Sequence, residues 1–240
     1  MTATDQWTDL LAADRGLLDR TSAAEQVAGV LRQRIIEGKL EPGTQLSEKG
    51  AAEALAVSRN TLREAFRLLV HERLLVHEFN RGVFVRVPSV DDVEDLYRSR
   101  RILEVGAVRR ASDAPDELVA DIDAAVSEGE RAARRQRWKD VGTANMHFHR
   151  ALAALEGSTR LNETMDQLLA ELRLAFHVME HPREFYEPYL ELNRDIADLI
   201  AEGRLETAVV RLDDYFDKAQ TQLVHAYTLK HRQRTHVAEG

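Results

Sequence analysis

Two arginines and an asparagine in the segment VSRNTLREAF have the side chains and the spacing needed to read DNA bases. On a helix, Arg59 and Arg63 share one face and Asn60 lies at its flank. A guanidinium group binds guanine edges or phosphate, and an asparagine amide can read adenine. The opposite face is apolar through Leu62, Phe66 and Leu69. The pattern indicates a DNA-recognition helix, although a helix face with two arginines can also be a solvated surface.

The segments around this helix predict a winged helix-turn-helix. Serine, threonine and glycine at the right positions begin and end the helices, and alternating apolar residues predict two strands. In chain order we expect a helix capped at Thr21 or Ser22 and ended by Gly38, a short helix from Ser47 to Leu55, the recognition helix Ser58–Val70, and strands over 74–79 and 83–87. The turn Asn80-Arg81-Gly82 would then place a cation and a closely approaching backbone beside the same groove.

The rest of the chain predicts an all-helical second domain. Helices are expected over 90–112, 116–136, 139–156, 159–181, 184–202 and 204–230, with Pro182 ending the fourth. The predicted fold is mainly α, a winged helix-turn-helix followed by an antiparallel helical bundle. The predicted domains are an N-terminal arm (1–20), a DNA-binding domain (21–88), an effector-binding and dimerisation domain (89–230) and a flexible tail (231–240).

Composition and charge fit this division. The chain of 240 residues has a net charge of −8, yet residues 21–87 carry 10 Lys and Arg against 8 Asp and Glu. The predicted DNA-binding domain is therefore mildly basic within an acidic protein. With no cysteine, the sequence excludes disulfides and thiolate chemistry. The absence of a signal peptide and of a long apolar run predicts a cytoplasmic protein without a membrane partner.

Residues 21–87 resemble the winged-helix domain of the GntR superfamily. The resemblance rests on the Pro42-Gly43 turn, Leu46-Ser47-Glu48, Val57-Ser58-Arg59, Leu62-Arg63-Glu64-Ala65 and the Gly82 wing. It implies that DNA is contacted by Lys49, Ser58, Arg59, Asn60, Thr61, Arg63, Asn80, Arg81 and Gly82. Three positions depart from the family pattern: Ala56 and Arg73 stand where glycine is common, and Gly50 stands where a capping glutamate is usual. If the position of Ala56 needs a positive φ, alanine costs on the order of 1 kcal/mol there.

Residues 90–230 resemble the helical effector domain of the FadR branch of this superfamily. The resemblance rests on Tyr97 with Arg100-Arg101-Ile102-Leu103-Glu104, on Phe148-His149-Arg150-Ala151-Leu152, and on Ile196 with Ile200-Ala201-Glu202-Gly203. It implies an antiparallel bundle that forms a homodimer and binds a small carboxylate, often through a metal held by one Asp and three His. The implied function is a ligand-responsive transcriptional regulator, a repressor that a small carboxylate releases from an inverted-repeat operator.

The family's metal site maps onto this chain with one matching ligand. Its Asp falls on Asn145, and its three His fall on His149, Asn193 and Tyr215. Amide oxygens and a phenol are poor ligands for a transition metal, so we expect a polar cavity and no tightly bound metal or other cofactor. Arg100 falls where the family presents a cation to the effector carboxylate. It could instead pair with Glu104 along its own helix, and His149 could be a core histidine.

Two other functions have sequence support. His177, Glu180 and His181 match the H-x-x-E-H pattern of some zinc peptidases, which would make the protein a zinc-dependent hydrolase. The pattern lacks an evident third ligand, so we do not expect an enzyme, and a solvated helix end also explains it. The chain could also be a helical interaction module whose N-terminal domain docks another protein.

Overall fold

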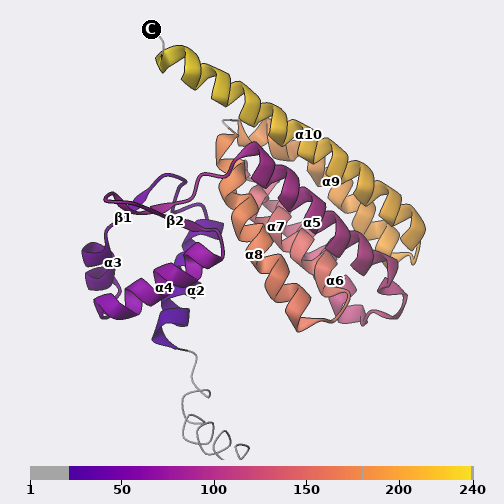
Figure 1. Cartoon of the computed structure of the whole chain (residues 1–240). Helices are drawn as coiled ribbons and strands as arrows, with labels where there is room; N and C mark the ends of the chain where they lie inside the picture. The colour runs from indigo at the N-terminus through magenta and orange to yellow at the C-terminus, as the bar shows by residue number, and fades with distance from the viewer. Residues whose placement is uncertain (1–21, 180, 239–240) are drawn as a thin grey trace, which may run out of the picture. The chain divides into compact units, whose positions relative to one another are not determined.

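Figure 1 shows a computed structural model of the chain, which describes residues 22–179 and 181–238 and the side chains up to residue 229. The predicted arm 1–20 and the alternative cap Thr21 lie outside the described residues, as does Glu180. The described chain forms two compact units. One comprises residues 22–34 and 44–85, and the other comprises residues 35–43 and 86–238.

The first unit is a winged helix-turn-helix. Its elements are α2 (Ala23–Ile36), β1 (Gln45–Leu46), α3 (Glu48–Ala54), α4 (Arg59–His71), β2 (Leu75–Glu78) and β3 (Gly82–Val85). The last two residues of α2 are counted with the second unit. Ser47 caps α3 and Ser58 caps α4, as predicted, because each hydroxyl accepts a hydrogen bond from a backbone N–H of the first turn. The predicted apolar face of α4 is buried through Leu62, Ala65, Phe66 and Leu69.

A small antiparallel sheet forms the wing. The strand order is β1-β3-β2, with Val76 opposite Phe84 and Gln45 opposite the same residue on the other edge of β3. The β2–β3 hairpin agrees with the predicted strands. Strand β1 was not predicted, because two residues are too few to show an alternating pattern.

Two residues that replace glycine have a left-handed backbone. Ala56 has a φ of 52° and Arg73 a φ of 58°. Each follows the last turn of a helix: the Val57 N–H donates to the Ala52 carbonyl, and the Leu74 N–H donates to the Leu69 carbonyl. These bonds complete the helix C-terminus that glycine usually forms. The position of Ala56 therefore does require a positive φ.

The second unit is a helical bundle, which confirms the predicted fold class. Its α-helices are α5 (Val90–Arg109), α6 (Asp116–Arg134), α7 (Trp138–Ala154), α8 (Thr159–Ala175), α9 (Pro182–Ala201) and α10 (Leu205–Ala238), with single 3-10 turns at Ala111–Asp113 and Phe176–Val178. Figure 1 shows α5 running along α10, and α6 packs on both α7 and α9. No helix among the described residues is long and apolar enough to span a membrane.

Two helix ends differ from the prediction. Pro182 begins α9, because proline fits the first turn of a helix, where the missing N–H would have no partner. The preceding helix already ends at Ala175. The backbone of α10 continues to Ala238, past residue 230, since no Gly or Pro interrupts residues 205–238.

Candidate DNA interface and effector site

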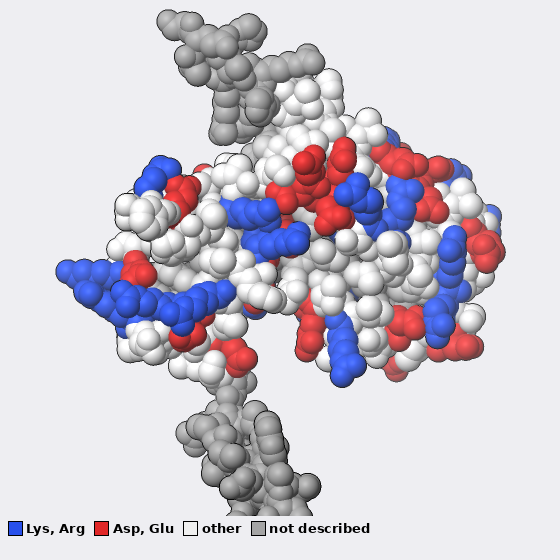
Figure 2. Space-filling model, in the orientation of Figure 1, with Lys and Arg blue, Asp and Glu red and all other residues white. Residues whose placement is uncertain are grey.

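The exposed face of α4 and the residues beside it contain the predicted DNA contacts. Arg59, Asn60 and Arg63 are exposed on α4, and Lys49 is exposed on α3. Ser58 and Thr61 lie at the helix start, where the Thr61 N–H donates to the Ser58 hydroxyl at 3.0 Å. Figure 2 shows Lys and Arg side chains gathered over the part of this unit that carries α3 and α4. The N-terminal turn of a recognition helix is where base contacts are made in helix-turn-helix proteins.

Arg63 is held by an acidic neighbour. Its Nε donates to Glu48 Oε2 at 2.8 Å, and both residues line a surface hollow of about 550 Å³ together with Arg67 and His77. Arg67 in turn pairs with Glu64. Helix periodicity does not predict the Arg63–Glu48 pair, because the two residues lie on different helices. The bond to Glu48 uses only the Nε–H of Arg63, so its Nη groups can bind a base edge or phosphate while the pair is kept.

The wing tip presents one cation and one large apolar side chain. Asn80 and Gly82 have positive φ values of 59° and 105°, which turn the chain tightly around Arg81. Gln45 Nε2 donates to the Arg81 carbonyl at 2.7 Å and so fastens the tip to β1. The Arg81 guanidinium pairs with Glu78, and Phe79 is 86% exposed. Phe79 was not among the predicted contacts, since an aromatic residue at the end of a strand usually indicates core.

A buried polar cluster connects four helices of the bundle. It contains Asn145 and His149 from α7, Asn193 from α9, Tyr215 from α10, and the α5 pair Arg100 and Glu104. His149 Nδ1 lies 2.6 Å from Glu104 Oε2, and His149 Nε2 lies 2.9 Å from the Tyr215 hydroxyl. Asn193 Nδ2 donates to Asn145 Oδ1 at 2.9 Å, and the Tyr215 hydroxyl lies 3.1 Å from the same oxygen. All five predicted effector residues therefore meet in one cluster.

Arg100 pairs with Glu104 on its own helix, which is one of the two alternatives that the sequence allows. Its Nε donates to Glu104 Oε1 at 3.0 Å, and its side chain is 1% exposed. The guanidinium carbon lies 5.3 Å from the ring centre of Tyr97 and 5.2 Å from that of Phe216. Among the described residues, Arg100 Nη2 and Asn193 Oδ1 are buried without a hydrogen-bond partner. The cluster therefore retains one unused donor and one unused acceptor.

Burial keeps the ionisable rings of the cluster neutral. Burial lowers the pKa of His149 below its usual 6.5, although the Glu104 carboxylate opposes this shift. Burial also raises the pKa of Tyr215 well above its usual 10.0. The Glu104 carboxylate can only accept, so Nδ1 of His149 carries the proton that it donates to Glu104.

The space beside the cluster is small. Asn145 and Asn193 line a cavity of about 10 Å³ with Tyr186 and Tyr189, the volume of roughly one water molecule. The family resemblance predicts a polar cavity here, whereas the structure has a packed, hydrogen-bonded cluster. The difference arises because Tyr215 and the two asparagines bond to one another and so fill the space between the helices.

The side chains of the cluster do not fit a transition metal. It offers one imidazole, two carboxamides and a phenol whose raised pKa keeps it protonated. Both nitrogens of His149 already have partners. Among the described residues, no group of three or more His, Cys, Asp or Glu is arranged to hold a metal ion.

The two histidines of the H-x-x-E-H pattern do not lie on one helix. His177 lies in a single 3-10 turn after α8, and His181 precedes the first residue of α9. His177 is exposed and lies 3.9 Å from a carboxylate oxygen of Glu41. The arrangement of two histidines one helical turn apart, which the hydrolase hypothesis needs, is absent from the described residues.

Comparisons with known proteins match both units. Residues 23–85 match the family described as bacterial regulatory proteins, gntR family, and residues 95–218 match the FCD domain. A GntR transcriptional regulator structure from Rhodococcus sp. RHA1 is 42% identical, with a TM-score of 0.81 over 86% of this chain and 100% of that one.

Two further relatives are named after the operons they control. The Nta operon transcriptional regulator of Aminobacter aminovorans is 28% identical over 182 residues, 74% of this chain and 85% of that protein. The gluconate operon transcriptional repressor of Bacillus licheniformis is 37% identical over 106 residues. That match covers 44% of this chain and 43% of the repressor, less than half of either protein.

Proposed function

This chain belongs to the gntR family of bacterial regulatory proteins, and we propose that it represses transcription from an inverted-repeat operator until a small carboxylate releases it. The observation that carries the proposal is the face of α4, where Arg59, Asn60 and Arg63 are exposed next to the wing. Donors on this face match base edges in the major groove, and Arg81 at the wing suits phosphate or the minor groove. The protein acts in the cytoplasm, where bacterial DNA is found.

The effector is a small carboxylate that binds at the polar cluster of the bundle. Arg100 supports this assignment, because it is a fully buried cation whose Nη2 has no hydrogen-bond partner among the described residues. A carboxylate there would gain a charge-assisted hydrogen bond in a region of low dielectric constant. A cavity of about 10 Å³ is too small for a carboxylate, so binding requires the helices to move apart. That movement is the structural change that the effector would select.

We further infer that the protein functions without a bound transition metal and without catalysis. The side chains of the polar cluster support function without a metal, since one imidazole, two carboxamides and a phenol bind a transition metal weakly. The relatives are transcriptional regulators, and His177 lies in a 3-10 turn whereas His181 precedes α9. Chelators should accordingly leave DNA binding and effector response unchanged.

The functional form is a homodimer that pairs through the helical bundle. One recognition helix covers too few base pairs to select a site in a genome, and a two-fold dimer reads two half-sites. The α5–α10 pair supports this placement, because Ile102 on α5 is 75% exposed and Val210 on α10 is 59% exposed. Large exposed apolar side chains often mark surfaces that another protein covers.

The test is selection of binding sites from random genomic fragments with the full-length protein, followed by affinity measurements on the enriched sequence. Arg59→Ala and Arg63→Ala should each weaken specific binding by roughly 1–3 kcal/mol if they read base edges. Arg98→Ala is the matched control, since it removes an exposed arginine from the helical bundle. Equal losses on specific and random DNA would make both arginines phosphate contacts. Unchanged affinity in both variants would contradict the assignment of α4.

A further inference from the structure

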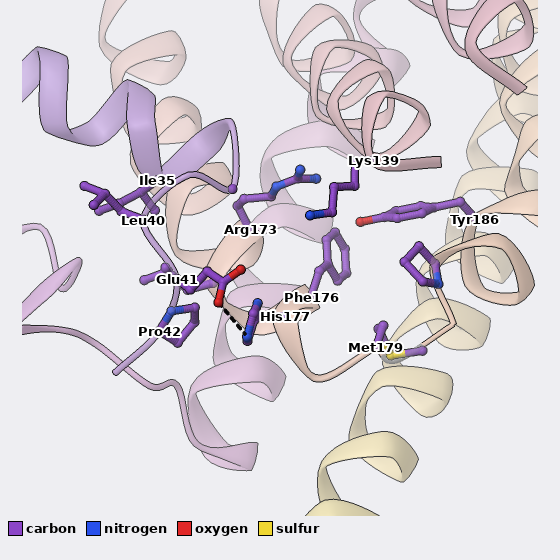
Figure 3. A pocket seen from close by; sticks show the side chains of 13 residues that line it. Ile35, Leu40, Glu41, Pro42, Lys139, Arg173, Phe176, His177, Met179 and Tyr186 are labelled. Carbon is purple, nitrogen blue, oxygen red and sulfur yellow. Dashed lines mark ion pairs between the residues drawn. The ribbon is translucent and has the colours of Figure 1, made fainter. Parts of the chain in front are cut away.

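A second cavity lies in the helical unit, apart from the polar cluster. Its volume is about 260 Å³, and its walls come from the segment Ile35–Gly43, the start of α7, the end of α8 with the 3-10 turn that follows it, and the start of α9. Figure 3 shows that the lining side chains converge from both sides on one space. The cavity is about the size of a compact organic molecule, close to the lower end of ligand sites in proteins.

The polar side of this cavity is cationic. Lys139 from α7 and Arg173 from α8 both line it, and Figure 3 shows the Lys139 ammonium group reaching into the space between Arg173 and Phe176. Glu41 is the one acidic side chain among the described lining residues, and it lies 3.9 Å from His177. Among these described residues two strong cations face one carboxylate, so an anionic group is favoured between Lys139 and Arg173.

Arg173 is positioned by two glycines that leave room for its guanidinium group. A Cβ atom at Gly142 would lie 2.7 Å from both Arg173 Nη1 and the Tyr186 hydroxyl. A Cβ atom at Gly38, where φ is +69°, would lie 3.3 Å from Arg173 Nη2. Burial raises the pKa of Tyr186 to about 12, so its hydroxyl stays protonated and can donate a hydrogen bond. The absence of a side chain at Gly38 and Gly142 thus leaves room for the Arg173 guanidinium, and at Gly142 also for the neutral Tyr186 hydroxyl.

The remaining walls are apolar. The other side chains that line the space include Leu40, Phe176 and Met179, together with Ile35 and Pro42. An inorganic phosphate ion would leave these apolar side chains exposed to water. An aromatic or branched hydrocarbon group would cover them and remove their apolar surface from water. A ligand that matches both sides has one anionic group and one compact apolar body.

We propose that this cavity is a binding site for a small organic monocarboxylate, distinct from the polar cluster around Arg100. The carboxylate lies between Lys139 and Arg173, and the apolar body packs on Phe176, Met179 and Leu40. Tyr186 lines both this cavity and the cavity of about 10 Å³ beside Asn145. The proposal does not depend on an effector at the polar cluster.

The experiment is calorimetric titration of the full-length protein with benzoate, phenylacetate and isovalerate as probes. At least one should bind saturably with one site per chain, whereas benzamide and inorganic phosphate should bind much more weakly.

Lys139→Gln should weaken binding of that probe about tenfold, because it removes one charged hydrogen-bond donor. Lys139 is exposed, so this change leaves the fold intact. Lys218→Gln, an exposed lysine outside the cavity lining, is the matched control and should bind normally.

A variant of the polar cluster separates the two proposed sites. Asn193→Ala should retain probe binding at the cavity. Loss of binding in Asn193→Ala with normal binding in Lys139→Gln would place the carboxylate at the polar cluster, which overturns this proposal and supports the effector site. Equal affinity for benzoate and benzamide, or no saturable binding of any probe up to about 20 mM, would also overturn it.

Discussion

At the scale of single residues, Ala56 and Arg73 occupy a backbone conformation that side chains with a Cβ atom adopt at a cost. Their φ values are 52° and 58°, and each completes the C-terminus of a DNA-binding helix. Glycine has no Cβ to clash in this region. We expect Ala56→Gly and Arg73→Gly each to raise the free energy of unfolding by about 0.5–1 kcal/mol, despite the greater freedom of glycine in the unfolded chain.

Thermal and denaturant unfolding of the three proteins would measure this gain. The control is Ala54→Gly, the last residue of α3, which has an ordinary helical position. There glycine should lower stability by up to about 1 kcal/mol. If Ala56→Gly behaved like Ala54→Gly, the left-handed backbone at residue 56 would carry no strain.

Some residue-level features can be predicted from sequence and others cannot. The caps Ser47 and Ser58 follow from local rules, because each bonds to the backbone three residues ahead. The pair between Arg63 and Glu48 joins two helices, and its existence depends on how those helices pack. The partner of Arg100 could not be predicted either, since a buried arginine can bind an acidic residue of its own helix or a carboxylate ligand.

At the scale of elements, periodicity predicted every α-helix of the bundle but not all of the ends. The pattern predicts that Pro182 ends one helix, whereas Pro182 begins α9, because the residue that stops a helix also suits the first turn of the next. The volume between helices was also beyond prediction. The family resemblance places Asn145, His149, Asn193 and Tyr215 at the positions of the family's metal ligands, but only the packing of the helices shows that these side chains fill the core.

The convergence of α7, α9 and α10 at the polar cluster leads to a prediction about metal binding. The triple change Asn145→Asp, Asn193→His and Tyr215→His would give one carboxylate and three imidazoles on these helices, counting His149. That ligand set suits zinc, and a metal that binds only the folded state raises the melting temperature. We expect zinc to shift the melting temperature of the triple variant by several degrees and to leave that of the wild type unchanged.

Differential scanning calorimetry with and without zinc would test this. Asn145→Asp alone serves as the control, because it adds a carboxylate without the two imidazoles. A triple variant that folds but shows no shift would mean that the four side chains cannot meet around one ion. A stoichiometric metal in the wild type would contradict the metal-free function proposed above.

At the scale of the whole molecule, basic side chains and exposed apolar side chains are found on different units of the chain. The net charge is −8, yet basic side chains gather over α3 and α4 in Figure 2. This distribution directs phosphate attraction to one unit and keeps acidic surface elsewhere. The apolar residues Ile102 and Val210 are exposed on the α5–α10 pair instead, where they are available to a second copy of the chain.

The dimer proposal makes a quantitative prediction for the intact protein. Ile102→Asp should raise the dimer dissociation constant at least about tenfold, since it would place an unpaired charge in an apolar interface. Ile102 is 75% exposed, so the substitution should not disturb the fold of the single chain. Sedimentation velocity across micromolar concentrations would show wild-type dimer and a shift of the variant towards monomer.

Phe79→Asp provides the matched control, because Phe79 is exposed to a similar degree, 86%, but lies in the wing. It should sediment as the wild type does. The Ile102→Asp variant should also bind an inverted repeat and an isolated half-site with similar affinity, since its DNA-binding units no longer act together. Wild-type protein that sediments as a monomer would refute the dimer, whereas a stable dimer of Ile102→Asp would place the interface away from Ile102.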